Sequence, residues 1–447
     1  MVKVITYGTY DLFHYGHQRL LERAKALGDY LIVGVTSDSF DLTRGKINAQ
    51  QSLMERIESV RATGLADEII VEEYEGQKID DIKRYGVDIF TVGSDWKGKF
   101  DYLNDFCKVV YLDRTEGVSS SEIRAEEREL RIGLVGNSNL INKFEVESHY
   151  VNGVSISGIC TVDDLDLSDD IKRNYMITDN LDKLLESSNA VYIVSHPKKH
   201  YEHVKKALLA NKHVLCESPI TTNVKEYEEL KGLASERNLQ LVDSIKTAYS
   251  TAYNRMLVLA KSGKIGDIVS VDAVCTSLSD LEKKTKRGTS LDEVWNSICA
   301  WGPTAMLPIF QLLGTEYVSK QITSHLIAPD FDTFTKIALV YPQAVASLKV
   351  GKGVKSEGEL IISGTKGYIY VPAPWWKTDY FEIRHENPAD NLRYFYQLDG
   401  EGIRFEVVTF LKSIRVGNSL TYLNSAVSEE IVNLISSFYK KENFIEI

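Results

Sequence analysis

The sequence predicts an α/β protein in which two domains built on parallel sheets precede an α+β domain with a largely antiparallel sheet. Three observations predict this arrangement. The chain has 447 residues, which is too long for one domain at ~150 residues each. Short β-branched runs alternate with helix-like segments, and the alternation restarts at Arg131. Beyond about residue 250 the runs are longer, alternate in polarity and are joined by turns. We therefore expect domains at residues 1–129, 130–250 and 251–447.

Strands and helices alternate throughout the first domain. Gly28 ends the first helical segment, and Ser52 with Glu55 has the spacing of a capping box that starts the next. Segments of these lengths predict parallel strands joined by right-handed crossovers. The expected strands span residues 2–7, 30–36, 68–71, 88–92 and 108–112, and the expected helices span residues 18–27, 52–63, 77–85 and 119–130.

The same alternation continues through the second domain and gives way to longer strands in the third. Parallel strands are expected at residues 131–136, 155–162, 190–195, 213–216 and 239–242, with helices at 200–210 and 223–236. Longer strands are expected at residues 319–328, 334–341, 344–351, 358–364 and 367–374, before a final helix at 427–441. Because turns rather than helices join these last strands, we expect them to pair mostly antiparallel.

Charge and composition argue against several classes of protein. The formal net charge is −11, whereas proteins that bind nucleic acid or anionic membranes carry a basic face. No stretch approaches ~18 consecutive apolar residues, and the N-terminus lacks a secretory pattern. We therefore expect a cytoplasmic protein with no nucleic-acid partner and no membrane span. Five scattered cysteines without a C-x-x-C pair predict neither a disulfide framework nor a zinc site: Cys107, Cys160, Cys216, Cys275 and Cys299.

The stretch YGTYDLFHYGH at residues 7–17 is the first candidate site. It follows the first expected strand and begins the first expected helix, where parallel sheets bind ligands and helix N-termini favour phosphate. His14 and His17 could bind a metal, lie in the core or donate to phosphate oxygens. A zinc site needs more ligands, and the first 130 residues contain no other histidine and only Cys107. Metal binding is therefore disfavoured, and the other two interpretations stay open.

Four blocks in the first domain resemble known enzymes. The sequence HYGH matches the H-x-G-H signature of the nucleotidyltransferase superfamily. Three further blocks resemble those of glycerol-3-phosphate cytidylyltransferases in the same order: TRGK at Thr43–Lys46, VGSDWKGKFDYL at Val92–Leu103 and YLDRTEGVSSSEIR at Tyr111–Arg124. The resemblance implies a Rossmann-like nucleotidyltransferase domain that transfers CMP from CTP to glycerol 3-phosphate or a close polyol phosphate. It also implies Mg²⁺ with the CTP and a role in teichoic acid or capsule biosynthesis.

The same resemblance assigns residues to the site. His14, His17, Lys46 and Arg114 would act in catalysis. The nucleotide would be bound by Gly8, Thr9, Tyr10, Asp11, Gly16, Asp95, Trp96, Thr115, Ser119 and Ser120. Alternatives are that Trp96 is a core residue and that Arg56 is a charge on an exposed helix face. Gly64 stands where the family often has arginine, which leaves the exact acceptor open.

The remainder of the chain resembles the Gfo/Idh/MocA oxidoreductases. Four blocks match landmarks of that family in order: RIGLVG, LLESSNAVYIVSHPKKHYEHVKKALLANKHVLCESP, LAKSGKIGDIVSV and FEVVTFLKSIRVG. The resemblance implies a second Rossmann domain, which in this family binds NAD(P), and an α/β substrate domain.

The residues that would carry the redox chemistry are missing. The dinucleotide loop keeps Gly136 but has Ser138 where a glycine is expected, and Glu217-Ser218-Pro219 replaces the family's Glu-Lys-Pro. Ala300, Thr304 and Leu307 stand where Asp, His and Asp are common. We therefore expect a degenerate cofactor site, a region kept for assembly or ligand sensing, and a homodimer or higher homo-oligomer. An active reductase with a relocated base is the alternative, with these candidates: Lys198, Lys199, His200 and Lys246.

Overall fold

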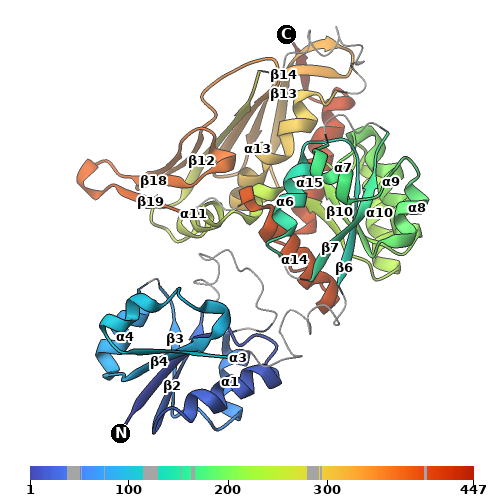
Figure 1. Cartoon of the computed structure of the whole chain (residues 1–447). Helices are drawn as coiled ribbons and strands as arrows, with labels where there is room; N and C mark the ends of the chain where they lie inside the picture. The colour runs from blue at the N-terminus through green and yellow to red at the C-terminus, as the bar shows by residue number, and fades with distance from the viewer. Residues whose placement is uncertain are drawn as a thin grey trace. The chain divides into compact units, whose positions relative to one another are not determined.

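The chain folds into two compact units. The computed structural model describes residues 1–37, 51, 53–74, 76–113, 129–151, 153–162, 167–278, 291, 294–396 and 400–447. The first unit covers Met1–Glu129, and the second covers nearly all of the remainder (Figure 1). Each unit is described by itself below.

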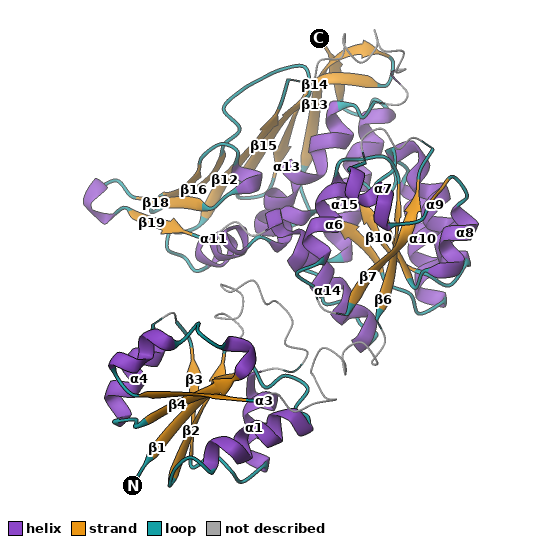
Figure 2. Ribbon diagram, in the orientation of Figure 1, coloured by secondary structure: helices purple, strands orange, loops and turns teal. Residues whose placement is uncertain are grey.

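A five-stranded parallel sheet forms the centre of the first unit, in the order β3-β2-β1-β4-β5. Neighbouring residues of β1 face opposite sides: Val4 packs in one apolar core and Ile5 in the other. Helices cover both faces (Figure 2). The strands are β1 Lys3–Gly8, β2 Tyr30–Thr36, β3 Glu68–Glu72, β4 Ile89–Gly93 and β5 Lys108–Leu112, and the helices are α1 Tyr15–Lys25, α3 Leu53–Ala62 and α4 Gln77–Tyr85.

The strand order in this sheet reverses between β1 and β4, which pair side by side. Ligands of open parallel sheets bind at such a point, beyond the carboxyl ends of the strands. The loop that follows β1 contains the predicted motif, so the fold positions that motif at the ligand-binding edge. Helix α1 begins at Tyr15, three residues before the expected start, because His14 caps it.

The second unit begins with a six-stranded parallel sheet in the order β11-β10-β9-β6-β7-β8. Its strand order reverses between β6 and β9, so Gly136 follows β6 at the equivalent point. The strands are β6 Leu130–Val135, β7 Val154–Cys160, β8 Ile177–Thr178, β9 Ala190–Ile193, β10 His213–Glu217 and β11 Leu241–Ser244. The helices are α6 Leu140–Ser148, α7 Asp169–Asn174, α8 Leu181–Ser187, α9 Pro197–Leu209 and α10 Val224–Glu236.

A nine-stranded mixed sheet completes the second unit, in the order β19-β18-β17-β16-β12-β15-β14-β13-β20. Most neighbours are antiparallel, as expected, but β12 pairs parallel with β15 and β13 with β20. The strands are β12 Ile268–Thr276, β13 Ser319–Ala328, β14 Phe331–Val340, β15 Val345–Gly351, β16 Leu360–Gly364, β17 Tyr368–Val371, β18 Tyr380–Arg384, β19 Leu392–Phe395 and β20 Phe444–Glu446. The longer helices are α11 Thr251–Lys261, α13 Ser297–Leu313, α14 Ile403–Val416 and α15 Ser425–Tyr439.

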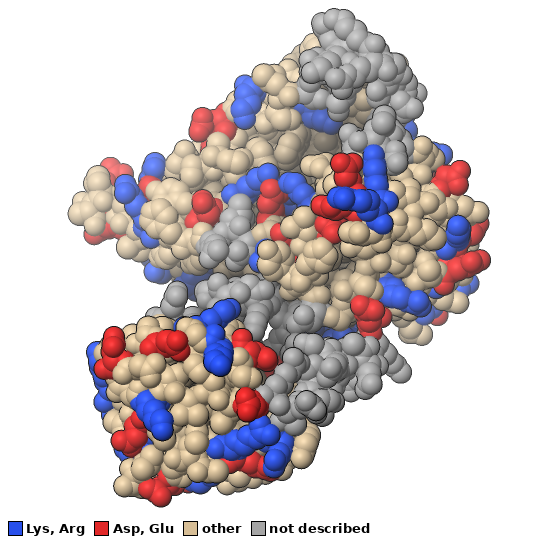
Figure 3. All heavy atoms as spheres, in the orientation of Figure 1, with Lys and Arg blue, Asp and Glu red and all other residues tan. Residues whose placement is uncertain are grey.

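The predicted fold class is confirmed: two parallel-sheet regions precede a largely antiparallel one. The expected helix at 119–130 lies mostly outside the described residues, and the boundary at residue 250 stays a prediction. Within the described ranges, no helix is long and apolar enough to cross a membrane. Basic and acidic side chains are interspersed over the face that Figure 3 shows.

Candidate active site

His14 has two roles at the start of α1. Its backbone is extended (φ −135°, ψ 175°), and its Nδ1 accepts a hydrogen bond from the backbone N of Gly16 at 3.0 Å. This contact caps the helix. A neutral imidazole whose Nδ1 accepts carries its proton on Nε2. The cap therefore leaves Nε2 as a hydrogen-bond donor at the positive end of a helix.

His17 stacks directly on His14. The two ring centroids are 3.9 Å apart with an interplanar angle of 23°, and Tyr10 contacts the His17 ring edge-on at 5.5 Å. Both histidines are only half-buried, which disfavours the interpretation of ordinary core residues. Among the described residues, no three His, Cys, Asp or Glu side chains come together as a metal site. The arrangement is that of a paired imidazole surface beside a helix N-terminus.

The loop between β1 and α1 is held in an unusual conformation. Tyr10 and Leu12 both have positive φ (54° and 48°), which non-glycine residues rarely adopt. The aromatic ring of Tyr10 is buried, and a Cβ on Gly8 would lie 3.1 Å from it. Asp11 is 1% exposed and accepts from the backbone N of Gln51 at 3.0 Å. Asp11 therefore positions the loop that carries the histidines.

Arg56 is not the helix-face charge that the sequence offered as an alternative. The side chain is completely buried. Its Nη1 donates to the carbonyl oxygens of Thr9 at 2.7 Å and Thr36 at 2.8 Å, and its Nε donates to that of Gln51 at 3.2 Å. Arg56 thereby joins the ends of β1 and β2 beneath the histidine loop. A charged residue among backbone carbonyls has no periodic signal, so the sequence could not reveal it.

A second buried polar group lies on the same edge of the sheet. Glu72, at the end of β3, forms an ion pair with Lys78 of α4 and accepts from the Thr36 hydroxyl at 2.9 Å. Both charged side chains are almost completely buried. The Nζ of Lys78 also lies 4.6 Å from the centroid of the Tyr7 ring. The edge that follows β1, β2 and β3 is thus polar and internally paired.

Some of the remaining predicted residues of this site lie in the described part of the chain, and the others lie outside it. Asp95 and Trp96 form a short 3₁₀ turn after β4, next to β1 in the sheet, with Asp95 exposed and Trp96 half-buried against Phe100. Gly64 has a φ of +66°, so an arginine there would be strained. The predicted residues outside the described ranges are Lys46, Arg114, Thr115, Ser119 and Ser120.

In the second unit the residues of the expected cofactor loop have structural explanations. Gly136 has a φ of 132°, and a Cβ there would lie 2.6 Å from the backbone N of Ser195. The close approach of β6 and β9 therefore requires this glycine. Ser138 accepts from the backbone N of Leu140 at 3.2 Å, which caps α6. The loop lacks the bare backbone that a pyrophosphate group needs.

The segment Glu217-Ser218-Pro219 lies at the end of β10 and contains no positively charged side chain. Ser218 is buried and its backbone N donates to the carbonyl of Ser244 at 3.2 Å. Burial raises the pKa of Glu217 to about 8, even though Lys246 and Lys352 act in the opposite direction. The carbonyl oxygen of Pro219 lies 2.8 Å from Nδ1 of His200.

Two of the candidates for a relocated base, Lys199 and His200, are engaged in other contacts. His200 is completely buried, with both ring nitrogens facing backbone carbonyl oxygens of Pro219 and Ser195. Lys199 forms an exposed ion pair with Glu202. In α13, Leu307 is completely buried, whereas Ala300 and Thr304 are partly buried.

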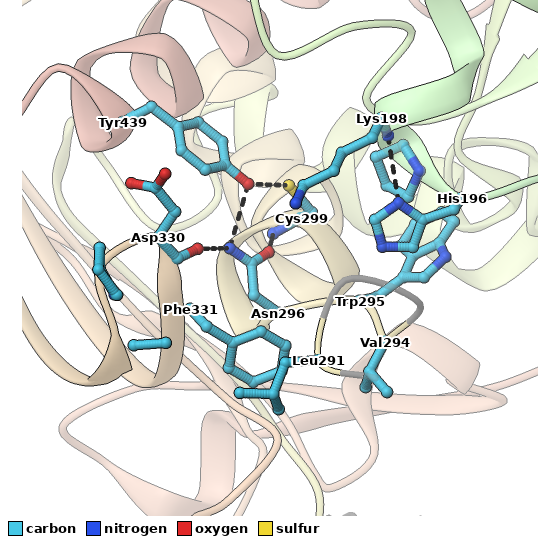
Figure 4. A pocket seen from close by; sticks show the side chains of 13 residues that line it. His196, Lys198, Leu291, Val294, Trp295, Asn296, Cys299, Asp330, Phe331 and Tyr439 are labelled. Carbon is cyan, nitrogen blue, oxygen red and sulfur yellow. Dashed lines mark hydrogen bonds between the residues drawn. The ribbon is translucent and has the colours of Figure 1, made fainter. Parts of the chain in front are cut away.

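A cavity of about 390 Å³ lies within the second unit, and Lys198 forms part of its wall. Asn296, Cys299 and Tyr439 point toward one another there (Figure 4). The Tyr439 hydroxyl lies 3.3 Å from Cys299 Sγ and accepts from Asn296 Nδ2 at 3.1 Å. Burial raises the pKa of the Cys299 thiol to about 12, so this sulfur is held as an unreactive thiol.

Comparisons with known proteins agree with both resemblances. Residues 5–126 match the cytidylyltransferase-like family, and residues 130–243 match the oxidoreductase family with an NAD-binding Rossmann fold. Through its first unit the chain belongs to the cytidylyltransferase-like family and is a nucleotidyltransferase. The chain therefore fuses a cytidylyltransferase unit to an oxidoreductase-type unit, as the sequence predicts.

Particular relatives narrow the class. The glycerol-3-phosphate cytidylyltransferase of Bacillus spizizenii is 51% identical over 126 residues, which is 28% of this chain and 97% of that protein. The enzyme of the same name from Staphylococcus aureus is 48% identical over 130 residues, 28% of this chain and 95% of that protein. The second unit shares its fold with KijD10, a 3-ketoreductase from Actinomadura kijaniata (TM-score 0.62, 17% identity, covering 72% of this chain and 100% of that one).

Proposed function

We propose that this protein transfers the cytidylyl group of CTP to glycerol 3-phosphate, forming CDP-glycerol and pyrophosphate. The observation that carries the proposal is the identity of about half of the aligned residues to glycerol-3-phosphate cytidylyltransferases over nearly their whole length. A close polyol phosphate is the alternative acceptor, because Gly64 stands where the family often has arginine.

The chemistry requires positioning more than acid–base catalysis. A phosphate oxygen of the acceptor attacks the α-phosphorus of CTP, and the bond to the β-phosphate bridging oxygen breaks to release pyrophosphate. A phosphate monoester is largely dianionic at pH 7, so no general base is needed. Nε2–H of His14 and the N-terminus of α1 would stabilise negative charge on the triphosphate, and we assign the stacked His17 to the same task.

Mg²⁺ is expected to accompany the CTP. The phosphates and water would hold most of the coordination positions of the ion, as is common for Mg²⁺. We assign the side chains named above to the nucleotide.

The decisive experiment is pyrophosphate release by the full chain with each nucleoside triphosphate and with glycerol 3-phosphate, glycerol 2-phosphate and longer polyol phosphates. We expect activity with CTP and glycerol 3-phosphate. His17→Ala should reduce kcat by roughly 10²–10³-fold, as expected for one lost donor. A strong preference for ATP would overturn the proposed nucleotide, and unchanged turnover by His17→Ala would remove this residue from the site.

We further propose that the second unit does not transfer hydride. The family match supports NAD(P) binding, but the residues present do not fit turnover. Transfer of hydride to or from an alcohol carbon needs a group that moves the hydroxyl proton, and neither Ala300 nor the buried Leu307 can do so. A panel of ketose phosphates with NADH and NADPH, followed at 340 nm, tests this proposal. Oxidation of either cofactor would favour a bifunctional enzyme that makes its own acceptor.

A cytoplasmic location, a homo-oligomeric state and a role in teichoic acid or capsule synthesis stay predictions.

A further inference from the structure

Three lysines of the second unit converge on one carboxylate. Glu401 Oε1 accepts from Lys377 Nζ at 2.7 Å, and its Oε2 forms an ion pair with Lys246. Lys143 Nζ lies 3.0 Å from both oxygens. The lysines come from separate elements: Lys143 from α6, Lys246 from the 3₁₀ turn Lys246–Tyr249 after β11, and Lys377 from the 3₁₀ turn Trp375–Lys377. All four side chains keep partial exposure, between 21% and 38%.

The backbone places Glu401 there in a strained conformation. Its φ is 52°, between Gly400 at 58° and Gly402 at 93°. Left-handed backbone is unfavourable for a residue other than glycine. A Cβ on Gly402 would lie 2.1 Å from the carbonyl oxygen of Lys246, so glycine alone permits this approach. The turn therefore presents the Glu401 carboxylate to the lysines at a conformational cost.

The cluster has more positive than negative charge. Although burial acts in the opposite direction, hydrogen bonds from Lys246 and Lys377 hold the pKa of Glu401 at about 2, so it is ionised. Lys246 lowers the pKa of Glu217 and of Glu406, but burial outweighs this effect and raises both pKa values to about 8, which favours the neutral form at pH 7. One carboxylate thus faces three ammonium groups, which leaves a local excess of about two positive charges.

The position of this cluster is also that of a ligand site. Lys246 follows β11, and Lys143 belongs to the helix that follows β6, so both stand beyond the carboxyl ends of parallel strands. Ligands of such sheets bind at this edge. A phosphate monoester carries nearly two negative charges and three oxygens at pH 7, which matches three lysine donors better than one carboxylate does.

We infer that Lys143, Lys246 and Lys377 form a binding site for a phosphate monoester, and that Glu401 fills it as an internal anion until such a ligand replaces it. The site does not depend on the proposed cytidylyl transfer. It retains anion recognition at an edge where the means of hydride transfer are missing.

Titration calorimetry of the full chain with inorganic phosphate and with glycerol 3-phosphate, at fixed ionic strength, tests the inference. Glu401→Gln should raise the affinity of one site by roughly tenfold or more, because the competing charge is removed. Adding Lys246→Gln to Glu401→Gln should abolish that gain. Any anion binding by the first unit is common to all these variants and cancels in the comparison.

Glu429→Gln is the matched control. Glu429 forms an ion pair with one lysine, the exposed Lys231, so its substitution should leave phosphate affinity unchanged. If Glu401→Gln fails to fold, Lys377→Gln in the otherwise wild-type chain should weaken phosphate binding by the second unit. Tighter binding of glycerol 3-phosphate than of phosphate identifies the ester as the ligand, and equal binding identifies the phosphate group. No gain in Glu401→Gln, or a gain that survives Lys246→Gln, overturns the inference. Pyrophosphate release is measured separately, so failure of either proposal is recognised on its own.

Discussion

At the scale of single residues, His14 shows how one side chain can serve folding and chemistry together. Its Nδ1 accepts from Gly16, which caps α1 and leaves Nε2 as the donor. Asparagine can cap a helix equally well, whereas alanine cannot. The two roles can therefore be separated by comparing two substitutions at one position.

We expect His14→Asn to keep the stability of the first unit within about 0.5 kcal/mol, and His14→Ala to lose about 1 kcal/mol, the usual worth of a cap. Both should lower kcat by roughly 10²–10³-fold because both remove the Nε2 donor. Urea unfolding and pyrophosphate release measure the two effects. Wild-type turnover by His14→Asn would show that His14 only caps the helix.

Arg56 has a structural task that is also tied to the site. Arg56→Ala should destabilise the first unit by about 1.5–3 kcal/mol, the usual worth of hydrogen bonds to a charged donor. It should also raise KM for CTP, because the loop that carries the histidines loses its support at Thr9. The matched control is Arg61→Ala on the same helix, whose side chain is 58% exposed. Equal effects of the two substitutions would contradict this role.

The sequence predicted the histidines because a motif in a strand-to-helix loop is a local pattern. It could not predict Arg56 or Glu401, since their partners come from other elements and only the tertiary fold brings them together. Buried charges are exceptions to the rule that lysine and arginine lie outside. Such residues are recognised only when the carbonyls or ammonium groups around them are known.

At the scale of elements, the strands were predicted more completely than the helices of the last region. Helix α13 was not predicted as a helix because it contains Pro303 and Pro308 and is apolar on most sides. Proline disfavours the helix interior, and a buried helix lacks an amphipathic period. Parallel pairing of β12 with β15 was also missed, because the chain returns to β12 only after α13, β13 and β14, a crossover that turns alone could not provide.

Strand β11 and helix α14 each carry a buried acid. Burial raises the pKa of Asp243 on β11 to about 7 and that of Glu406 on α14 to about 8. A carboxyl whose pKa is higher in the folded protein stabilises it at low pH, and this contribution is lost as pH rises. We therefore expect the second unit to lose stability between about pH 4 and pH 8.

Glu406→Gln should reduce that loss and stabilise the second unit at pH 8 by roughly 1–3 kcal/mol, since one pKa unit corresponds to about 1.4 kcal/mol. The amide can still accept from the Ser244 hydroxyl, which lies 2.9 Å from Glu406 Oε2. Urea unfolding at pH 5 and pH 8 followed by tryptophan fluorescence measures the effect, because four of the five tryptophans belong to the second unit. Glu429→Gln, an exposed control, should show no such change. A wild-type stability that rises toward pH 8 would contradict the expectation.

At the scale of the whole molecule, the chain combines two units with separate cores. Apolar residues of β1 and β2 pack with α1 and α3 in the first unit, while the second has its own clusters around β9 and α13. A compact unit with its own core usually unfolds cooperatively. A ligand stabilises the unit that binds it, by an amount set by its concentration relative to Kd.

Scanning calorimetry of the full chain should therefore show two transitions, of which CTP shifts only one. At a CTP concentration of 100 times Kd, the first unit should gain about 2.7 kcal/mol. His17→Ala weakens the site and removes only a half-buried ring from beside Tyr10, so it should reduce the CTP-dependent shift while leaving both transitions in place. A CTP-dependent shift of both transitions would mean that the units unfold as one or that the second unit also binds the nucleotide. The Glu401→Gln variant separates these cases, because this substitution should increase the phosphate-dependent shift of the second transition alone.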